Sequence, residues 1–175
     1  VRDIERVVVT DVDDEAVDRF VADHADAPFE VVGGTTEDAA GCDVVSTLTP
    51  SREPIVRHEW LQGGAHVNAM GADAAGKKEL DDGAVLDAHL VVDDPEQCLH
   101  SGEVNTLVSR GEFGEEDVYA TLGEVVAGEA PPREEDDVTV FDSTGLAIQD
   151  VAAARLVNER GRERGVGTPF ELVGT

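Results

Sequence analysis

The chain has 175 residues, with 39 Asp or Glu against 13 Lys or Arg, so its formal net charge is −26. So acidic a chain has no basic face for phosphates, which argues against a nucleic-acid partner. About 41% of the residues are hydrophobic, enough for one folded domain with a core. No apolar run reaches the roughly 20 residues of a membrane span, which argues against a membrane protein.

The start of the chain lacks a signal-peptide pattern, and Cys42 and Cys98 are isolated from each other. We therefore expect a cytoplasmic protein with free thiols. The cysteines and the five histidines share no metal-ligand spacing, so no metal is expected. The acids are dispersed along a chain that has only two lysines, Lys77 and Lys78. Such a surface resembles that of proteins from extreme halophiles, where salt screens dense like charge.

Short β-branched runs alternate with helical patterns along the chain. Strands are predicted at 6–10, 29–33, 43–49, 65–70, 90–94 and 137–143, and helical segments at 14–24, 35–41, 58–64, 77–89, 95–109, 115–127 and 145–164. Thr35 or Thr36 is a candidate N-cap, Gly41 and Gly165 are helix stops, and an apolar stretch at 169–173 closes the chain. The alternation predicts a parallel sheet, and the near-continuous apolar strands predict burial of both its faces.

Four strands are followed by polar or glycine-containing segments, which would meet at one edge of a parallel sheet. Asp11 follows the first strand and is placed to accept hydrogen bonds from the adenosine ribose of NAD; it disfavours the 2′-phosphate of NADP. Thr47 and Thr49 end the third strand, before Pro50. Each of these positions also has a plain structural reading, as a strand end or an exposed loop.

The segment "NAMGADAAGK" ends the fourth strand. Gly71 permits a close approach of backbone to a ligand. Asp73 is a candidate general acid or base, and Lys77 could offset cofactor charge or hydrogen-bond a carbonyl. Lys78 is expected to be a solvated side chain in a helical first turn. After the last strand, Ser143 and Thr144 are candidate N-caps of the final helix and candidate ligand contacts.

Several blocks occur in the order found in one family: "DVVSTLTPSREPIV", "EWLQGGAHVNAMGADAAGKKELD", "GEVNTLVSRG", "TLGEVVAGE" and "VFDSTGLAIQDVAAARLV". Together they resemble the ornithine cyclodeaminase/μ-crystallin family, in particular its archaeal alanine dehydrogenase branch. The resemblance covers essentially the whole chain.

The resemblance implies a Rossmann-type, doubly wound α/β domain over residues 1–142. Residues 143–175 would return to a substrate and dimerisation domain, and the full-length protein would be a homodimer. It implies hydride transfer between NAD(P) and the α-carbon of a small amino or imino acid. Asp73 matches the catalytic aspartate and Asp11 the ribose-binding acid. Met70, Gly71, Ala72 and Lys77 match the nicotinamide-side segment, Ser143 a cofactor contact and Thr144 a substrate-side contact.

The chain departs from the family at its start. A G-x-G-x-x-G turn is expected about 20 residues before the ribose-binding acid, whereas ten residues precede Asp11. We expect the first strand, the glycine turn and the substrate-binding domain to precede Val1, and the 175 residues alone to be inactive. Alanine dehydrogenase is the first expectation for the complete protein. Ornithine cyclodeaminase, a ketimine or imine reductase, and a non-catalytic μ-crystallin-type binding module remain alternatives.

Overall fold

The computed structural model describes residues 3–168 and residue 170. Contacts divide the chain into two units, Val1–Thr144 and Gly145–Thr175. The strands of the first unit are β1 (Arg6–Val9), β2 (Glu30–Gly33), β3 (Val44–Thr47), β4 (His66–Ala69), β5 (His89–Val92), β6 (Ala120–Thr121) and β7 (Thr139–Asp142). Its α-helices are α1 (Asp14–Asp23), α2 (Thr36–Ala40), α3 (Asp82–Leu86), α4 (Pro95–Ser101), α5 (Asn105–Ser109) and α6 (Leu122–Ala127), and its 3₁₀ turns are η1 (His58–Trp60) and η2 (Glu115–Asp117).

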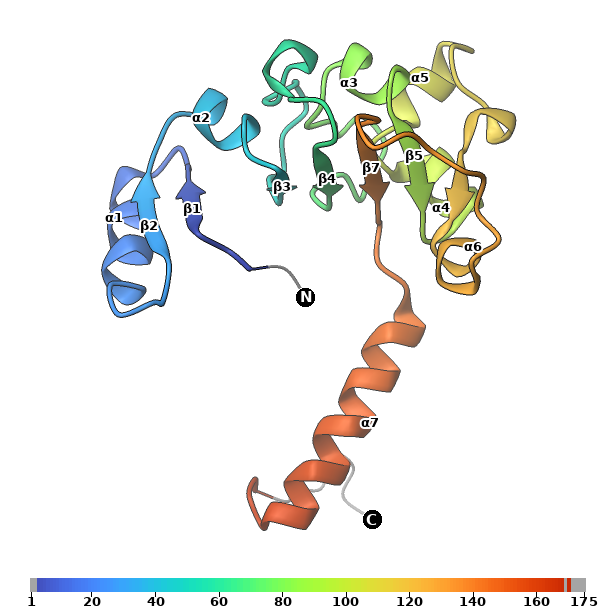
Figure 1. Cartoon of the computed structure of the whole chain (residues 1–175). Coiled ribbons are helices and arrows are strands. Elements are labelled where there is room, and N and C mark those ends of the chain that lie inside the picture. Colours follow the sequence, from blue (N-terminus) through green and yellow to red (C-terminus); the bar gives the residue numbers. More distant parts are fainter. Residues whose placement is uncertain (1–2, 169, 171–175) are drawn as a thin grey trace. The chain divides into compact units, whose positions relative to one another are not determined.

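The strands form two parallel sheets (Figure 1). The strands β1 and β2 make one sheet, and the other has the order β3-β4-β7-β5-β6. The last strand in sequence, β7, lies between β4 and β5, so the chain winds outward and returns to the middle of the sheet. The structure thus confirms the predicted α/β class with parallel strands.

One face of the larger sheet is buried. Alternate residues of β3, β4, β5 and β7 point into the core, and the residues between them are half-buried or exposed. Helices α3, α4 and α5 each contribute side chains to that core. The core residues are Ala40, Val45, Val56, Val67, Ala69, Leu80, Ala84, Val85, Leu90, Val92, Cys98, Val104, Leu107, Phe113 and Val140. The expectation that both faces are buried is wrong for the described residues.

Short-range sequence patterns predicted most of the helices and strands. All six predicted strands are present, each four residues long. Thr35 caps α2 in a capping box, and Gly41 and Gly165 end their helices, as predicted. The two-residue strand β6 was not predicted, because a strand this short carries no readable periodicity. The predicted helices at 95–109 and 115–127 are each divided into shorter elements.

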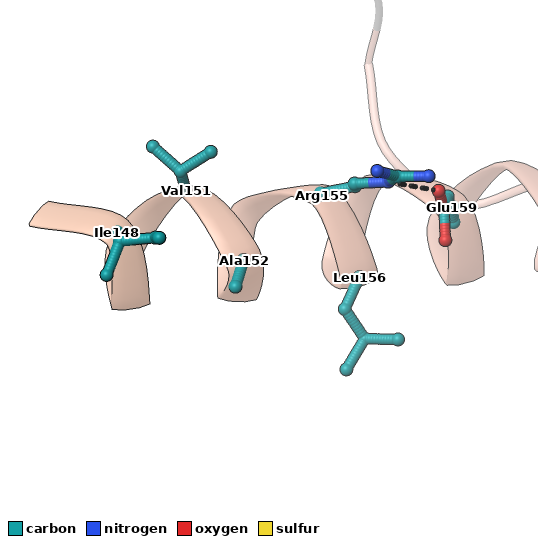
Figure 2. A pocket seen from close by; sticks show the side chains of 6 residues that line it. All are labelled: Ile148, Val151, Ala152, Arg155, Leu156 and Glu159. Atoms are coloured by element: carbon teal, nitrogen blue, oxygen red, sulfur yellow. Dashed lines mark hydrogen bonds and ion pairs between the residues drawn. The ribbon is translucent and has the colours of Figure 1, made fainter. Parts of the chain in front are cut away.

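The second unit is the helix α7 (Ala147–Arg164), followed by Gly165 in the left-handed conformation. Its apolar side chains are exposed, and Figure 2 shows Val151 and Leu156 leaving the helix on different sides. Arg155 and Glu159 pair along it at 2.9 Å. The predicted closing stretch at 169–173 falls almost entirely outside the described residues. In the described chain no helix is long and apolar enough to cross a membrane.

Candidate functional site

Three neighbouring strands end level with one another. Thr47 of β3 pairs with Ala69 of β4, which pairs with Asp142 of β7. The next backbone amides continue the ladder: Met70 N donates to the Thr47 carbonyl at 3.0 Å, and Ser143 N donates to the Ala69 carbonyl at 3.2 Å. The segments predicted to bind a ligand after β3, β4 and β7 therefore start at one sheet edge, where open α/β sheets bind ligands.

The loops after β3 and β4 are joined by a side chain that sequence reasoning did not select. The buried carboxylate of Glu79 accepts the backbone N–H of Thr49 at 2.5 Å and that of Gly71 at 2.9 Å. A Cβ at position 71 would lie 2.5 Å from Glu79 Cδ and closer still to the Thr49 carbonyl oxygen. Glycine is therefore required at position 71 by the approach of the Thr49 backbone and the Glu79 side chain.

Asp73 and Lys77 form an ion pair on the loop after β4. The Asp73 side chain is mostly exposed, whereas the Lys77 side chain is largely covered. The hydrogen bond from Lys77, with its positive charge, holds the pKa of Asp73 below its ordinary value. Asp73 is therefore a carboxylate across the neutral pH range, an acceptor of hydrogen bonds and a partner for a cationic amine.

The turn between these two residues is held from α5. Gly76 has φ +78°, a left-handed conformation that glycine adopts without strain. Its N–H donates to Asn105 Oδ1 at 2.8 Å, and Asn105 Nδ2 donates to the Lys77 carbonyl at 2.9 Å. The amide of Asn105 thus fixes the backbone on both sides of the Gly76–Lys77 peptide.

The residues after β7 do not cap the final helix. The N-cap of α7 is Leu146, with no side-chain hydrogen bond, so the predicted capping by Ser143 or Thr144 is wrong. The Ser143 hydroxyl instead donates to Asp93 Oδ2 at 2.6 Å, and Thr144 Oγ1 accepts from Gln97 Nε2, also at 2.6 Å. Both side chains tie the exit of β7 to the segment that follows β5.

The remaining predicted site residues occupy different surroundings. Asp11 is exposed and lies just beyond the end of β1, a strand of the smaller sheet. Its Oδ1 accepts from Asp13 N at 2.9 Å. Thr47 and Ala72 are buried. At the β4 exit the backbone carbonyl of Thr47 accepts the Met70 amide. Met70 is partly exposed beside them.

Lys78 is not the solvated side chain that the sequence suggested. It is buried and pairs with Asp82, whose second oxygen accepts from Arg110 Nη2 at 2.7 Å. This network lowers the pKa of Asp82, chiefly through the hydrogen bond from Lys78. Only Lys77 of the two lysines contacts Asp73.

Two further carboxyl groups are buried beneath the strand ends. Glu103 Oε1 accepts the N–H groups of Glu79 and Leu80 at 2.8 and 2.6 Å, and Asp142 Oδ2 accepts Glu103 N at 2.8 Å. Burial raises the pKa of Glu103 to about 7 and that of Asp142 to about 8. Burial likewise raises the pKa of the neighbouring Cys98 thiol to about 12, so this thiol is unreactive.

The sequence does not single out these two acids. In a chain whose acids mostly face solvent, Glu103 precedes two core residues within "GEVNTLV", and Asp142 ends an apolar strand. Nothing local distinguishes them from other acids, because their partners are backbone groups 23 to 39 residues away. Among the described residues, no group of three acids, histidines or cysteines could hold a metal ion.

The parallel sheet, with its loops gathered at the carboxyl ends of β3, β4 and β7, is the architecture of Rossmann-type domains. The chain belongs to the ornithine cyclodeaminase/mu-crystallin family, whose model matches residues 1–165. This confirms the resemblance read from the sequence blocks.

Alanine dehydrogenase of Archaeoglobus fulgidus is 48% identical over 171 residues, 97% of this chain and 53% of the relative. The structure of an archaeal alanine dehydrogenase dimer with bound NAD superposes with a TM-score of 0.90 and 47% identity, covering 99% of this chain and 54% of that one. The Thermococcus litoralis Δ1-pyrroline-2-carboxylate reductase, in complex with NADH and L-proline, gives 0.89 and 31%, covering 97% and 54%. The chain thus spans about half the length of the relatives it matches.

Proposed function

We propose that the complete protein is an NAD-dependent oxidoreductase of small amino or imino acids, with L-alanine as substrate. The observation that carries this proposal is the Asp73–Lys77 pair on the loop after β4, in a chain 48% identical to an alanine dehydrogenase. The products from L-alanine would be pyruvate and ammonia. The proposal concerns the full-length protein, since this chain covers about half of its relatives.

The residues present fit NAD chemically. Asp11, an exposed carboxylate beyond β1, suits the hydroxyls of the adenosine ribose and repels a 2′-phosphate. The exits of β4 and β7, at Met70, Gly71, Ala72 and Ser143, would line the nicotinamide side, with Thr47 and Thr49 beside them. When bound, NAD supplies the acceptor for the hydride that leaves the substrate α-carbon.

Asp73 would act on the substrate amine. Because Lys77 lowers the pKa of Asp73, the carboxylate is available to accept hydrogen bonds from the amine and from the water that hydrolyses the imine. Lys77 would hold Asp73 in place and offset charge near the cofactor. Thr144, held by Gln97, would lie on the substrate side.

The test uses full-length protein in molar salt. We expect NADH to form when L-alanine and NAD are supplied, and Asp73→Asn to reduce turnover by about a hundredfold or more while NAD still binds. Asp87→Asn, which alters an exposed carboxylate paired with His58, is the control and should leave turnover unchanged. Full activity of Asp73→Asn would overturn the proposed role.

The alternatives are separated by the same preparation. Ornithine cyclodeaminase activity would appear as NAD-dependent ammonia release from L-ornithine without net NADH. A ketimine or imine reductase would consume NADH with a cyclic imine. If neither these nor alanine oxidation occurs, and Asp73→Asn leaves ligand binding unchanged, the protein is a non-catalytic binding module of the μ-crystallin type.

We also infer the setting in which the protein works. The net charge of −26 and the two-lysine content favour a high-salt cytoplasm. A homodimer is proposed for the full-length protein, because the similar archaeal alanine dehydrogenase structure is a dimer. Sedimentation in molar salt measures this state.

A further inference from the structure

The backbone amides of Thr49 and Gly71 lie just past the ends of two paired strands. The β3–β4 ladder runs to the Thr47–Ala69 pair, and the Met70 amide extends it by one bond. Beyond this point the strand ladder ends although the Thr49 backbone still approaches Gly71 closely. A buried N–H without an acceptor costs about 1–3 kcal/mol. Glu79 supplies one carboxylate oxygen to each of these two amides. Its side chain therefore joins two loops that have left the sheet.

The main chain of Glu79 is fixed as firmly as its side chain. The Glu79 carbonyl accepts from Ile55 N at 2.7 Å and Val56 N at 2.9 Å. The Glu79 amide donates to the buried Glu103, whose own amide donates to Asp142 at the end of β7. Three buried acids thus connect the exits of β7, β4 and β3 through carboxylate-to-backbone hydrogen bonds.

Asp73 lies on the segment that Glu79 closes. Residues 71–79 leave β4 at Gly71 and return to the core at Glu79, so the hydrogen bond from Gly71 N to Glu79 Oε2 joins the two ends of this nine-residue loop. Between them stand Asp73 and Lys77, which pair with each other. The position of Asp73 relative to the β3 exit therefore depends on the length and acceptor capacity of the Glu79 side chain.

We propose that Glu79 is a positioning residue for the reaction: its carboxylate sets the spacing between the β3 and β4 exit loops and so the place of Asp73. This proposal rests on the proposed function, because Asp73 is its catalytic carboxylate. Glu79 itself is buried and would contact neither substrate nor cofactor. Displacements of about 1 Å at a reacting centre can cost on the order of a hundredfold in rate.

Asp81 offers a matched control two residues away. Its carboxylate likewise accepts two backbone amides from separate segments, His58 N at 3.1 Å and Ala84 N at 2.9 Å. These bonds hold η1 and α3 and do not reach the strand exits. Asp81→Asn therefore replaces one of these two acceptor oxygens by an NH₂ group, as Glu79→Gln does at Glu79, without touching the loops that carry the site.

The test compares Glu79→Gln with Asp81→Asn in the full-length protein in molar salt. In Glu79→Gln one of the two amides faces an NH₂ group, which cannot accept. At a temperature where both variants are folded, we expect Glu79→Gln to lower kcat by about tenfold or more, with substrate KM changed by less than about threefold. Asp81→Asn should leave kcat within about twofold of the unaltered enzyme while lowering the melting temperature. Equal effects on kcat would overturn the proposal.

Amide hydrogen exchange measures how well the two exit loops are held, and it does not require enzymatic turnover. Exchange in peptides covering 47–50 and 70–73 should accelerate by about tenfold in Glu79→Gln and stay unchanged in Asp81→Asn. If the unaltered protein turns over none of the substrates, the proposed function fails, and exchange still decides whether Glu79 joins the loops. If Glu79→Gln does not fold, Glu79→Asp replaces it: the shorter carboxylate should give the same pattern, and unaltered kcat and exchange would refute the proposal.

Discussion

Lys77 and Lys78 are adjacent in sequence and differ in every contact. Lys77 pairs with the exposed Asp73, whereas the buried Lys78 pairs with the half-exposed Asp82. In the full-length protein we expect Lys77→Ala to reduce turnover by about tenfold or more, since Asp73 loses the partner that lowers its pKa. Because that pKa then rises toward its ordinary value, the acidic limb of the pH–rate profile should move to higher pH.

The matched variant is Lys78→Ala. It removes an ion pair whose lysine side is buried but leaves Asp82 bonded to Arg110, so we expect a lower melting temperature and little change in kcat. Steady-state kinetics and thermal denaturation of both variants decide between the two roles. Equal losses of kcat would show that Lys77 has no special relation to Asp73.

Gly71 is required because of its neighbours. Gly71→Ala would press a methyl group into the Thr49 carbonyl and the Glu79 carboxylate. We expect a loss of about 1–3 kcal/mol in unfolding free energy and a weaker affinity for NAD. Gly123→Ala, within α6, is the control, because the nearest atom to its Cβ is Thr121 Oγ1 at 3.8 Å, and alanine there should stabilise by about 0.5–1 kcal/mol. Urea unfolding and NAD titration measure both; a harmless Gly71→Ala would contradict this account.

At the scale of elements, the sequence predicted more of the fold than of the site. Helix caps such as Thr35 and stops such as Gly165 are decided within a few residues, and the structure confirms both. The edge that collects the site segments also follows from sequence, because parallel strands end on one side. The two-residue strand β6 does not, since its formation depends on pairing with β5.

Long-range partners account for what the sequence left unread in the site. Glu79 lies 30 residues from the Thr49 amide that it accepts, and Asn105 lies 29 residues from the Gly76 amide. Ser143 looked like a helix cap because the rule for caps uses nearby residues, whereas its partner Asp93 is 50 residues away. The acids that become buried are of the same residue types as those that stay exposed, so only the folded structure distinguishes them.

The turn held by α5 provides a test at this scale. Asn105→Ala removes its hydrogen bonds to Gly76 N, the Lys77 carbonyl and the Gly102 carbonyl. We expect a loss of about 1–3 kcal/mol in unfolding free energy, and faster amide exchange over 74–78. Gln62→Ala, which removes one exposed hydrogen bond to Asp43, should stay within about 0.5 kcal/mol. Indistinguishable exchange in the two variants would show that Asn105 does not hold the turn.

The charge of the whole molecule predicts its response to salt. With 39 acids and 13 basic residues, most carboxylates can have no cationic partner, and their mutual repulsion opposes the compact state. The Debye length falls from about 10 Å at 0.1 M salt to about 3 Å at 1 M, so repulsion fades over this range. We expect the midpoint of urea unfolding to rise steadily from 0.1 to 1 M NaCl. A midpoint independent of salt would contradict adaptation to high salt.

Two buried carboxyl groups, those of Glu103 and Asp142, should make the folded state less stable as the pH rises above 5. The folded-state pKa values of Glu103 and Asp142, about 7 and about 8, lie above the values of about 4.5 and 3.8 expected on unfolding. At pH values between the unfolded-state and folded-state pKa values, the folded state holds more protons than the unfolded state. The stability that Glu103 and Asp142 contribute at low pH is therefore lost as the pH rises through 7 to 8. Each proton so held corresponds to a slope of about 1.4 kcal/mol per pH unit.

Substitution isolates the groups responsible. Asp142→Asn keeps an acceptor for Glu103 N but does not titrate, so we expect a shallower fall in unfolding free energy between pH 5 and 8 when urea unfolding is followed in molar salt. Glu124→Gln is the comparison: the capping bonds from Thr121 lower the pKa of Glu124, so its contribution is lost only as pH falls through the acid range. Its slope above pH 5 should match that of the unaltered protein, and an identical slope in Asp142→Asn would mean that Asp142 is ionised throughout this range.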